Sequence, residues 1–316
     1  MIMTDLYENT KGPKHKPVLY HEILIGLDPK NPHRYIDATL GAGGHAWGIL
    51  NASSPKGELF GLDVDPTAIA LAKEQLSDFK KRINIVQGSY TTLLEQLERI
   101  GWDKVQGIVL DLGVSSMQID TPSRGFSFLK DGDLDMRFSP AFENTAADIV
   151  NTYKEEDLAK IFWQYGEERK SRVLAKAIIK ERPFYRSLEL SDFIKKIIGK
   201  QQYKIHPATR VFQALRIEVN KELEALNRVL PQTINALSSG GRVAIISFHS
   251  LEDRLVKQFF KLESKDCICP SGQPICNCGH KAKIKEVNRK PIRPTEKEIE
   301  ANPRARSARL RIAQKL

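Results

Sequence analysis

Strand-like and helix-like segments alternate along the first third of the chain, and this alternation limits the possible folds more than any other feature. Short apolar runs are each followed, after a turn, by a segment whose apolar residues recur with helical spacing. The strand-like runs are 34–40, 57–65, 82–89 and 105–113, and the helix-like segments are 44–53, 67–76 and 92–100. The second helix has a clear start, with Asp65 as N-cap and Pro66 at its first position. This order predicts an α/β fold with a doubly wound, mostly parallel sheet.

From about Met117 the pattern becomes helical throughout. The helix-like segments there are 139–153, 155–166, 169–183, 190–200 and a long amphipathic helix over 210–230. The sheet pattern resumes with a buried strand at 240–250, and segments 282–290 and 307–315 predict an antiparallel pair at the sheet edge. We therefore expect one α/β domain made of residues 1–117 and 210–316, with residues 118–209 forming an all-helical insertion domain.

Acidic and aromatic residues follow the predicted strands where each strand stops. The first strand ends at Asp37, the second at Asp63, the third before Tyr90 and the fourth at Asp111. Ligands of open α/β sheets bind outside the carboxyl ends of the strands, so we expect these four side chains to lie around one ligand. Each aspartate taken singly is more typical of a capping or turn residue. Their recurrence at successive strand ends favours a binding site.

The glycine turn after the first strand does not have the dinucleotide-binding spacing. Gly41, Gly43 and Gly44 are followed by His45, whereas a pyrophosphate-binding turn has the pattern G-x-G-x-x-G. The carboxylates around this turn would repel a pyrophosphate but suit a cationic nucleoside without phosphates. S-adenosylmethionine, with a sulfonium and an amine, is such a nucleoside, and Asp63 is expected to bind its ribose hydroxyls.

Composition indicates a globular chain with an anionic partner. The 316 residues carry a net charge of +10, and no apolar run approaches the length of a membrane span. The N-terminus lacks the apolar centre of a signal peptide, so we expect a cytoplasmic protein and no membrane partner. Basic residues gather at Lys195, Lys196, Lys200, Lys204 and Arg210, and in a tail from Lys281 to Arg311. In this tail they alternate with apolar residues, as on a half-exposed strand. Charge alone leaves a simply basic protein as the alternative to a nucleic-acid binder.

Long sequence strings spread over nearly the whole chain carry a resemblance to a known family. They are HKPVLYHE, DATLGAGGHA, GLDVDPTAI, DLGVSSMQID, RGFSF, GDLDMRF, HPATRVFQALRIEVN, IISFHSLEDRLVK and NPRARSARLRIA. In this order they resemble the bacterial 16S ribosomal RNA cytosine-N4 methyltransferase family.

The resemblance implies a class I methyltransferase fold with a seven-stranded sheet, interrupted by a helical domain that recognises RNA. It implies S-adenosylmethionine as cofactor and, as substrate, a cytidine in the decoding region of 16S rRNA in the small ribosomal subunit. Its cofactor contacts fall on Gly43, Gly44, His45, Asp63, Tyr90, Asp111 and Gln118. The family often has Phe where this chain has Tyr90, and either ring preserves stacking on adenine.

The catalytic residues are less well defined. A cytosine amine is a poor nucleophile, so the protein must align it, accept its N–H groups and later take a proton. Many amino methyltransferases place an Asn/Asp/Ser-Pro-Pro-aromatic tetrad after the fourth strand, but this chain has DLGVSS there. The candidates by position are Asp111, Ser115, Ser116, Ser247 and His249. A capping role is the alternative, especially for His249, which precedes a predicted helix start with Ser250 as N-cap and Asp253 at N3.

RNA contacts are predicted for two segments. The loop 124–128 offers Arg124, Phe126 and Phe128 for stacking on an unpaired base, with a hydrophobic plug between domains as the equally weighted alternative. His206 and Arg210 either lie near the RNA or simply begin the helix that returns to the sheet.

All four cysteines of the chain lie within 12 residues of one another, as Cys267, Cys269, Cys276 and Cys278, with His280 close by. Two C-x-C pairs have the ligand count for a tetrahedral structural zinc, although C-x-x-C is the usual spacing. Reduced cysteines in an exposed loop are the alternative, and a disulfide is a poor fit for a cytoplasmic chain.

Three functions are compatible with these features. The first is the rRNA methyltransferase, and the second is a nucleotide-dependent oxidoreductase, which the glycine spacing and the extra carboxylates disfavour. The third is an RNA-binding ribosome-assembly factor with little turnover. A homodimer is compatible with the sequence but does not follow from it.

Overall fold

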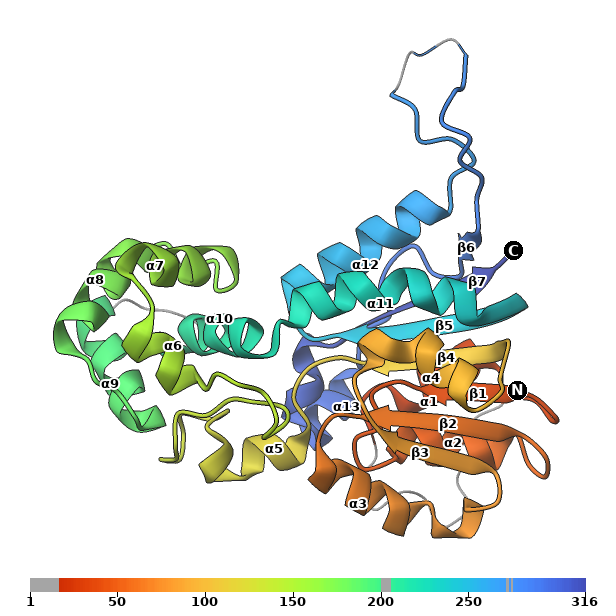
Figure 1. Cartoon of the computed structure of the whole chain (residues 1–316), viewed down its shortest axis with the longest axis horizontal. Helices are drawn as coiled ribbons and strands as arrows, with labels where there is room; N and C mark the ends of the chain where they lie inside the picture. The colour runs from red at the N-terminus through yellow and green to blue at the C-terminus, as the bar shows by residue number, and fades with distance from the viewer. Residues whose placement is uncertain (1–16, 200–205, 271–272, 274) are drawn as a thin grey trace. The chain divides into compact units, whose positions relative to one another are not determined.

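The computed structural model describes residues 17–199, 206–270, 273 and 275–316, and the chain divides into two compact units (Figure 1). Unit 1 consists of residues 1–113 and 225–316, and unit 2 of residues 114–224. None of the helices among the described residues combines the length and apolar character that crossing a membrane requires.

Unit 1 is built on a seven-stranded sheet with the order β3-β2-β1-β4-β5-β7-β6. The strands are β1 (Arg34–Asp37), β2 (Glu58–Asp63), β3 (Ile83–Gln87), β4 (Val105–Asp111), β5 (Leu237–Ser247), β6 (Ile284–Glu286) and β7 (Arg309–Lys315). The first five strands run parallel, and β7 runs antiparallel between β5 and β6. The predicted α/β class, its mostly parallel sheet and its antiparallel edge pair are confirmed.

Helices cover both faces of this sheet because successive strand residues point to opposite sides. On β1, Tyr35 packs with α1, α2 and α3, whereas Ile36 packs with α4, α11 and α12. The helical segments of unit 1 are α1 (Tyr20–Leu27), α2 (Gly44–Ala52), α3 (Pro66–Gln75), η2 (Ser77–Phe79), η3 (Tyr90–Thr92), α4 (Leu93–Arg99), α11 (Glu222–Ala236, in unit 1 from residue 225), α12 (Ser250–Glu263), α13 (Glu296–Ala301) and η5 (Pro303–Ser307). The α3 start is as predicted, with Asp65 accepting a hydrogen bond from Thr67 N and Pro66 at the first position.

The basic tail is not the half-exposed strand that its alternation predicts. Strand β7 has neighbours on both sides and is largely buried, and Arg311 is only 3% exposed. The Arg311 guanidinium donates to Asp253 Oδ1 at 2.7 Å, and Arg309 donates to Asp253 Oδ2 at 3.0 Å. Burial opposes the charge of Asp253, but these hydrogen bonds outweigh it and hold its pKa below the ordinary value. Part of the tail's positive charge is therefore paired with a carboxylate inside unit 1.

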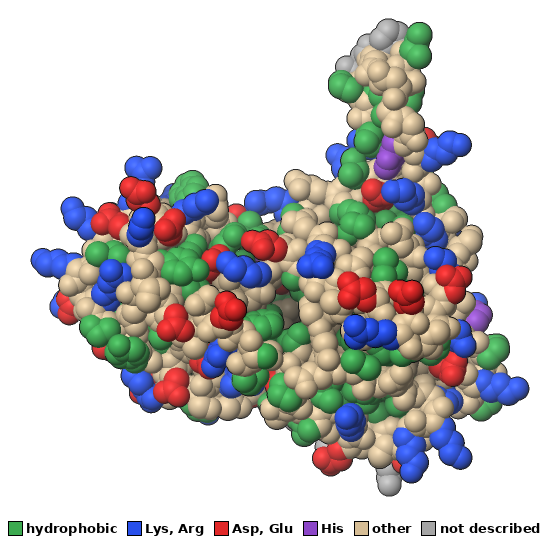
Figure 2. Space-filling view, in the orientation of Figure 1, with side chains coloured by type: hydrophobic (Ala, Val, Ile, Leu, Met, Phe, Trp, Pro, Cys, Tyr) green, Lys and Arg blue, Asp and Glu red, His purple; other side chains and the backbone are tan. Residues whose placement is uncertain are grey.

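Between α12 and β6, the described residues 264–270, 273 and 275–283 extend away from the rest of unit 1, and they are called the hairpin 264–283 (Figures 1 and 2). Helix α12 starts after the carboxyl end of β5 and runs back along the sheet. The hairpin therefore leaves the sheet near the amino ends of the parallel strands, opposite to their carboxyl ends.

Unit 2 is all-helical, as predicted. Its helices are α5 (Ser116–Asp120), η4 (Pro122–Arg124), α6 (Ala146–Thr152), α7 (Glu155–Gln164), α8 (Ser171–Glu181), α9 (Ser187–Ile198) and α10 (Ala208–Asn220). The helix expected over 139–153 is shorter, because Thr145 caps α6 and its side chain and that of Asp148 form a capping box. The apolar faces of α6 to α10 share one hydrophobic core.

The single helix predicted over 210–230 is in fact two helices. Lys221 has φ 49° and ends α10, and α11 starts at Glu222. Helix α10 packs on α6, α7 and α9, so it belongs to unit 2. The chain accordingly returns to unit 1 at residue 225 instead of residue 210. The helical period continues across the break, and therefore the sequence pattern does not reveal it.

Candidate functional site

The glycine turn joins β1 to α2 and brings the backbone close to α3. Gly41 and Gly43 have φ of 53° and 87°, in the left-handed region that favours glycine. A Cβ at Gly43 would lie 2.8 Å from the Leu76 side chain, which is closer than a carbon contact allows. The turn places Gly44 and His45 at the start of α2, as the sequence predicts.

Asp63, at the end of β2, holds this turn in place. Its carboxylate accepts hydrogen bonds from Gly41 N (2.7 Å) and Asp65 N (2.9 Å). Burial raises the pKa of Asp63, although the bonds from Asp65 and Gly41 oppose the shift. Two backbone donors leave further lone pairs on the carboxylate for hydroxyl donors of a ligand.

Asp37, His45 and Asp111 form a buried polar group beside the turn. His45 Nε2 lies 3.6 Å from Asp111 Oδ2, and His45 is 4% exposed. Asp37 Oδ2, Asp111 Oδ1 and both ring nitrogens of His45 have no hydrogen-bond partner within the described part of the chain. Buried polar atoms are normally paired, so such a group fits a ligand that supplies hydrogen-bonding groups of its own.

Burial raises the pKa of Asp37 to about 7, against the opposing influence of His45. The carboxylates of Asp111 and Asp63 also raise it. A cation bound among these three aspartates would therefore stabilise their ionised forms.

Tyr90 follows β3, at the same edge of the sheet. It is the first residue of η3, and its half-buried ring packs on the hydrophobic core beneath β2 and β4. This packing holds the ring in place. Stacking of the Tyr90 ring on a flat ligand stays a prediction.

The residues after β4 form a helix cap. Ser115 Oγ accepts from Gln118 N at 3.2 Å, and Gln118 Oε1 accepts from Ser115 N at 3.1 Å. Ser116 is the first residue of α5. All three belong to unit 2, and sequence reasoning did not predict this reciprocal capping box.

The polar groups after β5 are also engaged in local structure. The hydroxyl of Ser247 donates to Arg309 O at 3.3 Å. His249 caps α12 and accepts from Glu252 N, so Glu252 occupies N3. The predicted cap, with Ser250 at the N-cap and Asp253 at N3, was wrong by one residue. The shift leaves Asp253 free of the cap, and Asp253 pairs with the arginines of β7.

In unit 2, the aromatic loop 124–128 packs inward. Phe126 stacks on Phe138 with ring centroids 5.7 Å apart, and Arg124 donates to the carbonyl oxygens of Arg137 and Phe138 at 2.8 and 3.0 Å. Phe126 and Phe128 both pack against the hydrophobic core of unit 2. This packing favours a structural role of the two rings.

His206 and Arg210, at the start of α10, also have partners within unit 2. The His206 ring stacks on Phe128 at 4.7 Å, and its Nδ1 accepts from Ala208 N at 3.2 Å. Arg210 Nη1 lies 3.7 Å from the buried Glu168 carboxylate.

The other basic residues near α9 divide into two groups. Lys195 and Lys196 are exposed in the last turn of α9. Lys200 and Lys204, which the sequence places in the same basic cluster, lie outside the described residues.

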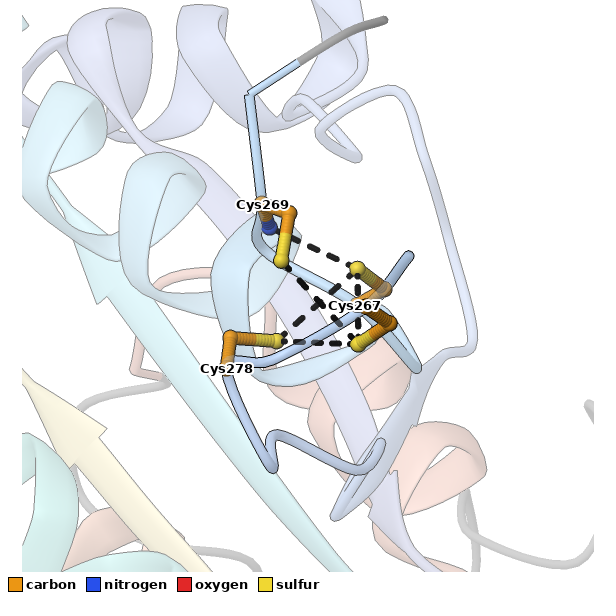
Figure 3. A group of neighbouring side chains, drawn as sticks. Cys267, Cys269 and Cys278 are labelled. Atoms are coloured by element: carbon orange, nitrogen blue, oxygen red, sulfur yellow. Dashed lines mark hydrogen bonds between the residues drawn. The ribbon is translucent and has the colours of Figure 1, made fainter. Parts of the chain in front are cut away.

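The four cysteines come together on the hairpin 264–283. Figure 3 shows the sulfur atoms of Cys267, Cys269 and Cys278 pointing toward one another. All four Sγ atoms, including that of Cys276, lie within 4.8 Å of one another. The predicted ligand cluster is thus assembled, and His280 stands apart from it, with Nε2 3.1 Å from Leu262 O.

Two further residues contact the site residues, and the sequence pattern did not assign them a site role. The Thr39 hydroxyl accepts from Asp111 N at 2.6 Å, which connects the ends of β1 and β4. The Tyr20 ring stacks against His45 with centroids 6.4 Å apart. The sequence signal for Thr39 is its hydroxyl side chain two residues after the strand-end Asp37. No local sequence pattern marks Tyr20.

Comparison with known proteins gives a consistent result. The model of a family described as the MraW methylase family matches residues 12–316. A protein of Thermomicrobium roseum named ribosomal RNA small subunit methyltransferase H is 46% identical over 312 residues, covering 98% of this chain and 96% of the relative. The protein of the same name from Carboxydothermus hydrogenoformans is 47% identical over 306 residues, covering 96% and 98%.

A more distant match is a solved structure. An rRNA methylase from Streptococcus thermophilus has 10% identity and a TM-score of 0.43 over 94% of this chain and 95% of its own. A similarity of this size says nothing about ligand or substrate.

Proposed function

The chain belongs to the MraW methylase family, and on this premise we propose that it methylates the exocyclic N4 amine of a cytidine in the decoding region of 16S rRNA, with S-adenosylmethionine as methyl donor. The observation that carries the proposal is the group of buried polar atoms of Asp37, His45 and Asp111 that have no hydrogen-bond partner among the described residues. This group lies beside a glycine turn that is held by a third carboxylate.

The strand-end residues fit the chemistry of this cofactor. The carboxylates of Asp37 and Asp111 complement its positive charges, and Asp63 retains lone pairs for the ribose hydroxyls. The Tyr90 ring would stack on the adenine, and Gly43, Gly44 and His45 complete the proposed contacts of unit 1. When bound, the cofactor supplies an electrophilic methyl group on its sulfonium.

The protein must hold and deprotonate the cytosine amine. Among the candidate acceptors, Asp111 has a carboxylate oxygen without a partner in the described ranges, and its backbone is fixed by Thr39. Ser115, Ser247 and His249 instead use their side chains in a helix cap or in a bond between strands. We therefore assign Asp111 as the first candidate for accepting the amine N–H, ahead of these three and of Ser116.

Unit 2 is proposed to recognise the RNA. Exposed Lys195 and Lys196 suit phosphate contacts, which supply affinity without sequence preference. The inward packing of Phe126 and Phe128 supports a scaffolding role for these rings instead of base stacking. A substrate in the small ribosomal subunit places the reaction in the cytoplasm.

Zinc is the second candidate cofactor. Its four cysteine ligands lie on the hairpin 264–283, at the sheet edge opposite to the strand ends, so zinc has no part in the methyl transfer proposed here.

Transfer of a labelled methyl group tests the function. Purified protein and labelled S-adenosylmethionine are incubated with unmodified small-subunit particles and, separately, with naked 16S rRNA, followed by nucleoside analysis. We expect label in N4-methylcytidine, and loss of label with Asp111→Asn. Label in another nucleoside would overturn the proposal. Binding to the particles with no transfer at all would favour the RNA-binding assembly factor.

A further inference from the structure

The described residues of the hairpin 264–283 form no hydrophobic core of their own. Among its described residues none is buried, and Ile275 is 79% exposed. Figure 2 shows hydrophobic side chains on its surface, toward solvent. At its base, Lys283 N donates to Glu263 O at 2.8 Å. A segment of this length loses much conformational entropy on ordering, so another interaction must hold it.

The sulfur atoms of the four cysteines supply the geometry of such an interaction. Cys276 Sγ lies 3.4 Å from Cys267, 4.0 Å from Cys269 and 3.6 Å from Cys278. Cys267 and Cys278 are 3.8 Å apart. A tetrahedral zinc with Zn–S bonds of about 2.3 Å places its sulfurs about 3.8 Å from one another. The four distances bracket this value.

Main-chain donors point at the sulfurs. Ile268 N donates to Cys278 Sγ at 3.5 Å, and Cys269 N donates to Cys267 Sγ at 3.4 Å. Four thiolates around a divalent cation leave a net negative charge, and N–H groups aimed at sulfur compensate it. Free thiols in a mobile loop have no need of such an arrangement.

We propose that Cys267, Cys269, Cys276 and Cys278 bind one zinc ion with tetrahedral geometry. The ion replaces the four thiol protons, which are released to solvent. All four positions are taken by protein ligands, so the site is structural and has no place for a reactive water. The bound ion takes the place of a core and holds the hairpin in a defined conformation.

The metal content of the full chain tests the proposal directly. Protein purified without an affinity tag or chelator is passed through gel filtration and analysed for metals. We expect about one zinc per chain. Replacement by Co²⁺ is expected to give the intense visible absorption of a tetrahedral cobalt thiolate. A metal-free chain with four reactive thiols, or with none because of disulfides, would overturn the proposal.

Two variants locate the ligands. The double variant Cys267→Ser/Cys278→Ser is expected to lose the zinc and the cobalt spectrum, whereas His280→Ala is expected to retain both. Zinc retained by the double variant, or lost by His280→Ala, would contradict the four-cysteine site. Binding of S-adenosylmethionine, measured in parallel, reports folding of the rest of unit 1. Failure of the methylation test leaves these readouts unaffected, since the zinc site lies at the opposite sheet edge.

Discussion

Two regions of the chain are rich in ligand-binding residue types, but they use their polar groups in opposite ways. At the strand ends of unit 1, Asp37, His45 and Asp111 have buried polar atoms without hydrogen-bond partners in the described structure. In unit 2, the Arg124 guanidinium donates to main-chain carbonyls, and the His206 ring stacks on Phe128 while accepting from the main chain. The polar atoms at the strand ends are thus available for the ligand we propose, whereas the side chains of the aromatic loop are engaged within unit 2.

This difference shows how to separate a site from a scaffold. A buried polar atom without a partner costs free energy, about 1–3 kcal/mol each, and persists where a ligand repays it. Rings and guanidinium groups that are satisfied internally need no ligand. Substitutions at Asp37, Phe128, Asp63 and Tyr90 test this contrast, in order of decreasing expected effect.

Asp37→Asn should reduce the pH dependence of stability. The pKa of Asp37 in the folded chain, about 7, lies above the ordinary 3.8, so folding takes up a proton between these values. The stabilising contribution of Asp37 is therefore fully present below pH 3.8. As the pH rises from 3.8 to about 7, the free energy of unfolding falls by up to about 1.4 kcal/mol per pH unit. Denaturant unfolding at several pH values should show this slope in the wild type and a clearly smaller slope in Asp37→Asn, because Asp63, whose pKa is also raised, still contributes. The exposed Asp78→Asn serves as the control and should keep the slope; equal slopes in all three proteins would refute the role of Asp37.

Phe128→Ala should destabilise unit 2 by about 2–3 kcal/mol, because its half-buried ring packs on His206 and Phe212. S-adenosylmethionine binding should be unchanged. The neighbouring Leu129, 82% exposed, is the matched control, and Leu129→Ala should shift stability by less than about 0.5 kcal/mol. Unchanged stability of Phe128→Ala together with weaker RNA binding would reverse the assignment and make the ring a base-stacking residue.

Asp63→Ala should weaken S-adenosylmethionine binding at least tenfold, that is by about 1.4 kcal/mol or more. The change removes the proposed ribose acceptor and the bond to Gly41 N that holds the turn. Isothermal titration measures the affinity, and Asp63→Asn, which keeps one acceptor oxygen, should be intermediate. Asp103, exposed before the start of β4, provides the control Asp103→Ala. An unchanged affinity of Asp63→Ala would remove Asp63 from the site.

Tyr90 should show the smallest effect. Tyr90→Phe keeps a ring for stacking and should change the affinity for S-adenosylmethionine by less than about twofold, whereas Tyr90→Ala should weaken it by about 3- to 10-fold. Titrations with both variants distinguish stacking from a role of the hydroxyl. A large loss with Tyr90→Phe would point to the hydroxyl instead.

Much of unit 1 could be predicted because its signals are local. The alternation of apolar runs with helical segments marks the strands and helices, and Asp65-Pro66 marks the start of α3. Strand ends meet at one edge of any parallel sheet, so Asp37, Asp63 and Asp111 could be brought together before their contacts were known. The cysteines of the hairpin are close in sequence, and their convergence follows from their spacing.

Other features depend on partners that are distant in the sequence, and only the tertiary structure decided them. Arg311 is buried because β7 lies between two strands and because Asp253, 58 residues earlier, pairs with it. The break at Lys221 follows the packing of α10 on the helices of unit 2 and leaves the helical period intact. Thus the sequence by itself determined the order of elements and which carboxylates share an edge. The tertiary structure decided which polar groups are already satisfied, because a hydrogen-bond partner is chosen by distance in space and not by distance along the chain.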